Sequence, residues 1–260
     1  MIQTSADNTM FNLLGATTSY VVTLFEESIP GLYHWGSAIR PRDRLPLPVE
    51  SQGFSVTNRL GGTDCDTERA GCRFHLTRLS QEYPGALSGD YRCPSWLAVT
   101  AEGRPAMDLS LRSSRVYAGR PSIEELPFAR GKEDASIQSL ELVLEDKVTG
   151  LAVYLNYTLF PECDVIVRSS RLCNESKDSI TLEKASSFSL DLPPDALAAM
   201  SLGASNPGTL CGAGVQSGFE LISFDGVWAR ERHLSRSRLG NGRTVLASRR
   251  GVSSHHMSPA

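Results

Sequence analysis

Acidic and aromatic residues in the first half of the chain have the chemistry that recognition or cleavage of a sugar would need. Glu82 and Asp90 could form a pair of carboxylates. Such pairs cleave glycosidic bonds when the carboxyl groups lie about 5–5.5 Å or 6.5–9.5 Å apart, a distance that sequence spacing does not set. Aromatic rings beside hydrogen-bonding groups are typical of small-molecule pockets, although Tyr and Trp in strands more often belong to the core or the sheet surface. The aromatic candidates are Tyr33, Trp35, Tyr83, Tyr91, Trp96 and Tyr117, and Arg92 is a further polar candidate.

Metal and cofactor sites have little support in the sequence. Zinc is usually held by Cys and His at close spacing, and neither Cys65 with Cys72 nor His255 with His256 has partners at a suitable spacing. The six Cys include no C-x-x-C pair, so we interpret them as buried or free thiols. The sequence has no G-x-S-x-G elbow, P-loop, H-E-x-x-H or Gly-rich dinucleotide fingerprint. We therefore expect no metal and no cofactor.

Arginines gather near the end of the sequence. Such a block could bind phosphate or RNA, but no interleaved aromatic residues for base stacking accompany it, which favours a solvated or docking surface. The whole chain has 26 Lys and Arg against 29 Asp and Glu, a formal net charge of −3, so it has no overall basic field and we expect no nucleic-acid partner. The arginines are Arg230, Arg232, Arg236, Arg238, Arg243, Arg249 and Arg250.

Hydrophobic residues that alternate with polar ones indicate β-strands, because successive side chains of a strand point to opposite faces. Leu140, Leu142 and Leu144 fall at a period of two, so we expect one face of their strand to be buried and the other to be at least partly wet. The last four of five predicted strands are expected to pair in sequence as an antiparallel meander. The five are Ser19–Phe25, Ile137–Leu144, Leu151–Phe160, Asp164–Leu172 and Ser179–Leu190, with a turn at Asp146–Gly150.

These patterns predict an all-β fold, a large sandwich of antiparallel strands with few short helices. Helical periodicity is nearly absent, and Pro194–Met200 is the only short helical candidate, which disfavours βαβ architecture. The composition, with 40% hydrophobic and 21% charged residues over 260 positions, is that of an ordinary globular protein. Val49–Gly71 and Leu202–Gly218 are polar and rich in turn residues, so we predict long loops or insertions there.

Signals for secretion or membrane insertion are weak. Met1–Tyr20 contains no Lys or Arg and no unbroken apolar stretch, which argues against a signal peptide. Apolar runs elsewhere last only a few residues, far short of the roughly 20 needed to cross a bilayer. We therefore expect a cytoplasmic protein without a membrane partner.

Several separated motifs occur in one order across nearly the whole chain. No single motif is diagnostic, but their number, order and spacing are specific. They are Ser19-Tyr20-Val21, Leu32-Tyr33-His34-Trp35-Gly36, Gln81-Glu82-Tyr83-Pro84, Gly89-Asp90-Tyr91-Arg92, Gly119-Arg120-Pro121, Ser189-Leu190-Asp191-Leu192-Pro193, Gly226-Val227-Trp228 and Ser248-Arg249-Arg250-Gly251. On these motifs the chain resembles the N-terminal region of the family 36 glycoside hydrolases, the α-galactosidases.

The resemblance implies a large β-supersandwich domain over residues 1–260, incomplete at its C-terminal end. In the family this domain precedes a (β/α)8 barrel that hydrolyses terminal α-galactosides, such as raffinose-type sugars, with retention. Both catalytic groups there are Asp residues of the barrel. The chain stops at Ser258-Pro259-Ala260, so the resemblance implies that the barrel and any catalytic residue are absent and that the chain is inactive alone. The partners implied for the complete enzyme are an α-galactoside, bound through the barrel, and further copies of the same chain in a homo-oligomer.

The chain departs from the family pattern at two places. Family members send a loop toward a neighbouring subunit's sugar pocket, and its counterpart here is Val49–Leu76, in which Glu50 and Arg73 match the acidic and basic pocket residues most closely. Leu202–Gly218 is an extra stretch, either a surface loop or an artefact of the gene model. A second reading of the chain is a stand-alone carbohydrate-binding or assembly module.

Overall fold

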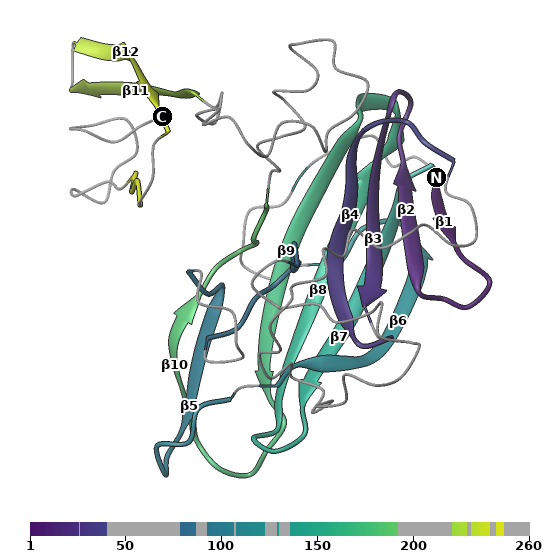
Figure 1. Ribbon diagram of the computed structural model, residues 1–260, viewed down its shortest axis with the longest axis vertical. Helices are drawn as coiled ribbons and strands as arrows, with labels where there is room; N and C mark the ends of the chain where they lie inside the picture. Colours follow the sequence, from purple (N-terminus) through teal and green to yellow (C-terminus); the bar gives the residue numbers. More distant parts are fainter. Residues whose placement is uncertain are drawn as a thin grey trace, which may run out of the picture. The chain divides into compact units, whose positions relative to one another are not determined.

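The predicted all-β class is confirmed by the computed structural model (Figure 1). Two compact units, Met1–Asp191 and Leu192–Ala260, make up the chain. In the described part of the chain the 3-10 turn η3 (Pro161–Cys163) is the only helical segment. The structure describes residues 1–25, 27–40, 79–86, 93–106, 108–122, 129, 136–191, 220–227, 230–239 and 243–246.

The first sheet of the larger unit has four antiparallel strands in chain order. The predicted strand Ser19–Phe25 is confirmed as β3, which is almost wholly buried because Tyr, Val, Leu and Phe fill both of its faces. Antiparallel neighbours that follow one another in sequence need only short turns, and the β2–β3 turn is closed by the Gly15 N–H donating to the Thr18 carbonyl at 2.9 Å. The strands are β1 (Ile2–Thr4), β2 (Met10–Leu14), β3 (Thr18–Phe25) and β4 (Ile29–Ser37).

The second sheet is also a four-stranded meander in chain order. The predicted turn at Asp146–Gly150 is confirmed: the Asp146 carboxylate accepts the Val148 and Thr149 N–H groups at 2.9 and 3.1 Å, and Gly150 takes a φ of 75°. The predicted strand Leu151–Phe160 pairs with the preceding strand from Leu151 to Leu159, as the alternation predicts. The strands are β6 (Ser110–Ala118), β7 (Gln138–Asp146), β8 (Leu151–Phe160) and β9 (Val165–Asn174).

The predicted membership of the meander is wrong at one end. Its fourth strand is β6, whereas β10 (Ile180–Ala185) leaves the sheet and pairs with β5 (Trp96–Thr100) in a separate two-stranded sheet. Alternation shows which face of a strand is buried but not which strand lies beside it. Trp96 and Ala98 of β5 are fully buried, and the Ala98 carbonyl accepts the Ala106 N–H at 2.9 Å.

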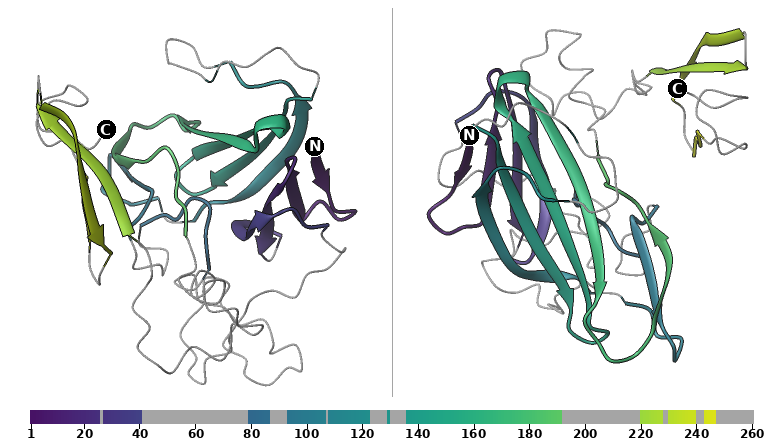
Figure 2. Two further views of the ribbon diagram at one scale, coloured as in Figure 1. Left: turned by 90° about the horizontal axis from the view of Figure 1, so that it is seen from above. Right: turned by 180° about the vertical axis from the view of Figure 1, so that it is seen from behind.

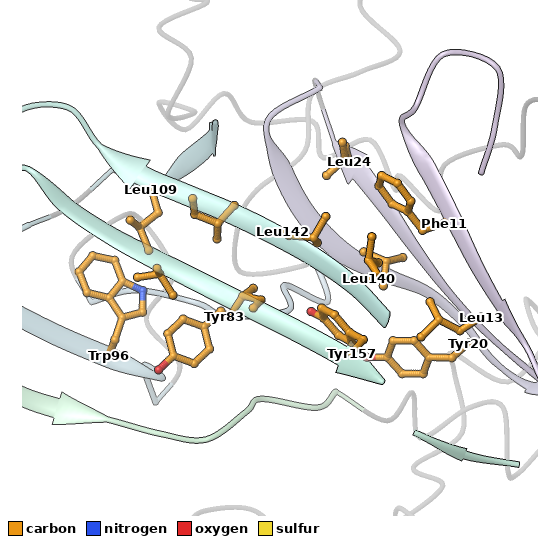
Figure 3. Close-up of a cluster of buried hydrophobic side chains, with 14 of the residues drawn as sticks. Phe11, Leu13, Tyr20, Leu24, Tyr83, Trp96, Leu109, Leu140, Leu142 and Tyr157 are labelled. Carbon is orange, nitrogen blue, oxygen red and sulfur yellow. The ribbon is translucent and has the colours of Figure 1, made fainter. Parts of the chain in front are cut away.

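The two four-stranded sheets pack face to face and form the core (Figure 2). Leu140, Leu142 and Tyr157 from β7 and β8 meet Phe11, Leu13, Tyr20 and Leu24 from β2 and β3, as Figure 3 shows. Interdigitation of the inner faces of two sheets is the basis of a β-sandwich. The predicted sandwich is therefore confirmed for the larger unit.

The smaller unit contributes one described ladder, β11 (Glu220–Val227) with β12 (Arg230–Arg238). The predicted helix Pro194–Met200 and the predicted loops Val49–Gly71 and Leu202–Gly218 lie outside the described residues. Within the described ranges, no helix is long and apolar enough to cross a membrane.

Candidate functional site

Glu82, a candidate acidic residue, lies inside the sandwich with 1% of its surface exposed. Its Oε1 accepts the Tyr20 hydroxyl at 2.7 Å, and its Oε2 accepts the Tyr157 hydroxyl at 2.8 Å. The Arg168 guanidinium of β9 lies 2.6 Å from Oε2 and also donates to the Ser189 carbonyl at 2.8 Å. These four side chains form a polar brace between the first sheet, β8 and β9, which we call the Glu82 brace.

Burial governs the electrostatics of the Glu82 brace. It raises the pKa of the Glu82 carboxyl above its usual value, while the charge of Arg168 and the two phenol donors limit that rise. Burial, followed by the charge of Glu82, also raises the pKa of Tyr20 and Tyr157, which keeps both phenols as neutral donors. Both Glu82 oxygens are occupied by protein groups. Glu82 is therefore a structural residue. It is not available as one carboxylate of the catalytic pair with Asp90 that the sequence suggested.

An open groove of about 950 Å³ lies on the face of the β6–β9 sheet that points away from the core. One row of side chains crosses its floor from strand to strand: Arg115 pairs in register with Glu141, Glu141 with Asn156, and Asn156 with Ser169. These positions alternate with the core residues of the same strands. We call this surface the outer groove.

The outer groove also corrects the expectation of a wet second face on β7. Ser139, Glu141 and Val143 on that face are buried, Glu141 being 9% exposed. Glu141 is tolerated there because the Arg115 Nε lies 2.7 Å from its Oε1 and neutralises it. The strand alternation predicts that Glu141 points away from the leucines, but not that neighbouring strands would cover it.

Aromatic rings border the row of polar residues. The Arg115 guanidinium stacks over the Tyr117 ring at 5.0 Å, and the Tyr117 hydroxyl donates to the Asn156 Oδ1 at 3.3 Å. Arg171 stacks over the Tyr154 ring at 3.9 Å. The ion pair, the two stacked arginines and the bonded phenol hold these side chains together in the absence of a ligand. Among the described lining residues Glu141 is the only carboxylate, whereas glycoside hydrolysis needs two.

The candidate aromatic residues do not gather at one site. Tyr83 and Trp96 are core residues, and the Tyr83 hydroxyl donates to the Ser186 carbonyl at 2.7 Å. Trp35 lies on β4, 52% exposed, with its ring 6.3 Å from that of Tyr20. Tyr117 lines the outer groove, and Tyr33 also lies on β4, half-buried. Glu141, Asn156 and Ser169 were not predicted, because only the register of four strands brings them together.

Several predicted residues lie outside the described part of the chain: Glu50, Cys65, Cys72, Arg73, Asp90, Tyr91, Arg92, Arg249, Arg250, His255 and His256. Of the arginine block, Arg230, Arg232, Arg236 and Arg238 lie on β12, and the Arg236 guanidinium is 3.3 Å from the Glu220 carboxylate. The described residues contain no cluster of His, Cys, Asp or Glu that could hold a metal ion.

The fold and the site define an antiparallel β-sandwich domain with a sealed polar brace and a preformed outer groove. Residues 28–203 and 214–260 match the sequence pattern described as the glycosyl hydrolase family 36 N-terminal domain. The chain therefore belongs to that family.

Relatives and solved structures agree with this assignment. α-Galactosidase AgaA of Geobacillus stearothermophilus is 30% identical over 96% of this chain and 30% of its own length. The crystal structure of the family 36 α-galactosidase AgaB from the same organism superposes with a TM-score of 0.77 and 28% identity, over 98% of this chain and 31% of that structure. An AgaA variant in complex with raffinose superposes with a TM-score of 0.74 and 29% identity, over 95% and 30%. The chain spans about 30% of the length of AgaA.

Proposed function

We propose that this chain is the non-catalytic N-terminal sandwich of a retaining glycoside hydrolase that acts on terminal α-galactosides of the raffinose type. The observation that carries the proposal is the match of almost the whole chain to about 30% of an α-galactosidase. The raffinose in one related structure supports the substrate class. In this role the sandwich supports the assembly of the enzyme and the rim of its active site.

The chemistry of the described residues is consistent with a supporting role. A retaining mechanism needs a nucleophile and a general acid that face one glycosidic bond. Glu82 is sealed by three partners, and Glu141 is paired with Arg115 as the sole described carboxylate of the outer groove. The described sandwich therefore offers substrate no second carboxylate beside Glu141, and the catalytic pair of the proposed enzyme belongs to another part of the polypeptide.

The direct test compares the purified 260-residue chain with a longer polypeptide in which it is joined to the catalytic part of AgaA. Release of galactose from raffinose and of p-nitrophenol from its α-galactoside is measured for both. We expect no release by the chain alone and release by the fusion. Galactose release by the chain alone, at a rate proportional to protein concentration and stable through repurification, would contradict the proposal.

The proposed rim and oligomer have their own test in the fusion. Glu50→Gln and Arg73→Met are expected to raise KM for raffinose, and light scattering is expected to report a homo-oligomer. A monomer with an unchanged KM for both variants would remove this part of the proposal and leave the catalytic assignment intact.

A second candidate function is a stand-alone carbohydrate-binding or assembly module, which the preformed outer groove favours. Reading the transcript past codon 260 separates the two. An in-frame continuation into a catalytic domain supports the first function, and a stop codon supports the second.

A further inference from the structure

The floor of the outer groove holds hydrogen-bonding atoms that no protein group uses. Asn156 is 8% exposed, and its Oδ1 accepts the Tyr117 hydroxyl, but within the described ranges its Nδ2 amide has no hydrogen-bond partner. In the same part of the chain, the Ser169 hydroxyl and the second carboxylate oxygen of Glu141 also have none. The Asn156 amide lines the open groove, so a polar ligand can replace water as the hydrogen-bond acceptor of its Nδ2 group.

The three unused groups stand side by side. Glu141, Asn156 and Ser169 are register neighbours on three adjacent strands, which lie about 4.8 Å apart in a sheet. Along this row an acceptor is followed by a donor and then by a hydroxyl that can do both. Sugar hydroxyls also donate and accept, so consecutive hydroxyls of one or two sugar rings match the row.

The charges beside the polar row of the outer groove favour a neutral ligand there. The charges of Arg115 and Arg168 are balanced by Glu141 and Glu82, at 2.7 and 2.6 Å. The open carboxylate oxygen of Glu141 would repel an anion bound to the row, and Arg115 beside it would repel a cation. Arg120 and Arg171 also line the groove: the Arg120 guanidinium donates to the Ala129 carbonyl, and the Arg171 guanidinium is stacked on the Tyr154 ring.

The walls of the outer groove suit the apolar faces of sugar rings. Tyr117, Phe160 and Val167 line it beside the polar row. A volume of about 950 Å³ is within the range of about 300–1,000 Å³ usual for small-molecule sites. The groove is therefore large enough for more than one sugar ring.

We propose that the outer groove is a non-catalytic binding site for a neutral oligosaccharide, held by Glu141, Asn156 and Ser169. The site rests on these residues and not on the proposed function; only the choice of α-galactosides among the probes rests on it. Such a site would keep substrate near the catalytic part of the enzyme, or serve by itself if the chain acts alone.

Isothermal titration calorimetry of the purified chain with raffinose, stachyose and maltotriose tests the site. We expect millimolar or tighter binding of at least one sugar, unchanged between 0.15 M and 1 M salt because the ligand is neutral. Asn156→Asp keeps the shape of the side chain but replaces the donor with an acceptor, and should weaken binding at least about tenfold. Ser169→Ala, at a half-buried position, should weaken it about threefold.

Trp35→Ala is the matched control, because Trp35 is an exposed aromatic residue outside the outer groove. The affinity of this variant for the sugars is expected to stay within about twofold of that of the original chain. Absence of binding to all three sugars overturns the site, as does binding that Trp35→Ala abolishes and Asn156→Asp leaves intact. Salt-sensitive binding of inorganic phosphate in competition with the sugars also overturns it. If the chain binds maltotriose and its fusion cleaves no galactoside, the result upholds the binding site and contradicts the proposed function.

Discussion

At the scale of single residues, the Glu82 brace shows how an ionisable pair can be structural in a domain that resembles part of an enzyme. Two charges are removed from water here, and three hydrogen-bonding partners offset the cost for the carboxylate. Burying a complete pair adds little stability, but burying half of one is strongly unfavourable. The brace therefore fixes the geometry between the two sheets more than it adds to the free energy of unfolding.

Removal of the cation from the Glu82 brace should expose this asymmetry. Arg168→Met leaves Glu82 buried without its counter-ion, and we expect a loss of about 3–5 kcal/mol in the free energy of unfolding. Urea denaturation followed by fluorescence measures it. The double variant Glu82→Gln with Arg168→Met should recover part of the loss. Arg112→Met, which removes the exposed ion pair with Glu175, is the control and should cost much less. Equal losses for Arg168→Met and Arg112→Met would contradict the interpretation.

Asp164 should make stability fall at acidic pH. Its carboxylate accepts the Thr17 and Thr18 N–H and hydroxyl groups, which lower its pKa to about 2 from 3.8. A carboxyl group with a lowered pKa in the folded state stabilises above its unfolded pKa and loses that contribution as the pH falls from about 4 to 2.

Asp164→Asn tests this pH dependence, since Asn also tolerates the positive φ of 53° at this position. The original chain should be the more stable above pH 4, and the difference in unfolding midpoint should shrink toward pH 2. Thermal melts at pH 2, 3, 4 and 6 measure it. Asp7→Asn serves as a comparison, because Ser5 and Thr9 lower the pKa of Asp7 similarly at a site remote in sequence. A difference for Asp164→Asn that stays constant with pH would show that the carboxylate charge is not responsible.

At the scale of elements, the sequence pattern predicted where strands run better than it predicted which strands lie side by side. Leu151–Phe160 and its turn were predictable because the alternation of residue types and an Asp to Gly turn are properties of adjacent residues. That both faces of this strand are largely buried was not predictable. The pairing of β10 with β5 was not predictable, because the two strands lie far apart in the sequence. The outer groove was not predictable for the same reason. Glu141, Asn156 and Ser169 lie on three strands, and only the pairing register brings them side by side. Tyr83 and Trp96 were plausible ligand platforms because residue type alone does not report burial.

The packing of β5 against the segment that contains Gly85 depends on that glycine. A Cβ on Gly85 would lie 2.5 Å from the ring of the fully buried Trp96, too close for any ordinary contact. We expect Gly85→Ala to destabilise the sandwich by about 1–3 kcal/mol through overpacking. Gly36→Ala is the control, because its Cβ would meet only the His34 ring at 3.4 Å or more, and it should change stability by less than about 0.5 kcal/mol. Urea midpoints compare the two, and a neutral Gly85→Ala would show that the Trp96 ring moves freely.

At the scale of the whole molecule, the family pattern and the compact units divide the chain differently. The family match runs over residues 28–203 and 214–260, so it includes parts of both units. Each described hydrophobic cluster, however, lies within Met1–Asp191. The described hydrophobic core therefore belongs to the larger unit, and a core of its own is what a domain needs in order to fold alone.

A fragment of residues 1–191 should consequently keep a cooperative urea transition and a β-type circular dichroism spectrum. The last residues of this fragment matter: the Ser186 carbonyl accepts the Tyr83 hydroxyl, the Ser189 carbonyl accepts Arg168, and Leu190 packs on the core. A fragment of residues 1–185 keeps every described strand of the larger unit but lacks all three contacts. We expect it to unfold at a lower urea concentration, because Tyr83 and the Glu82 brace then lose acceptors at buried positions. Loss of cooperativity already in 1–191 would mean that residues 192–260 complete the sandwich, and the two compact units would then be one folding domain.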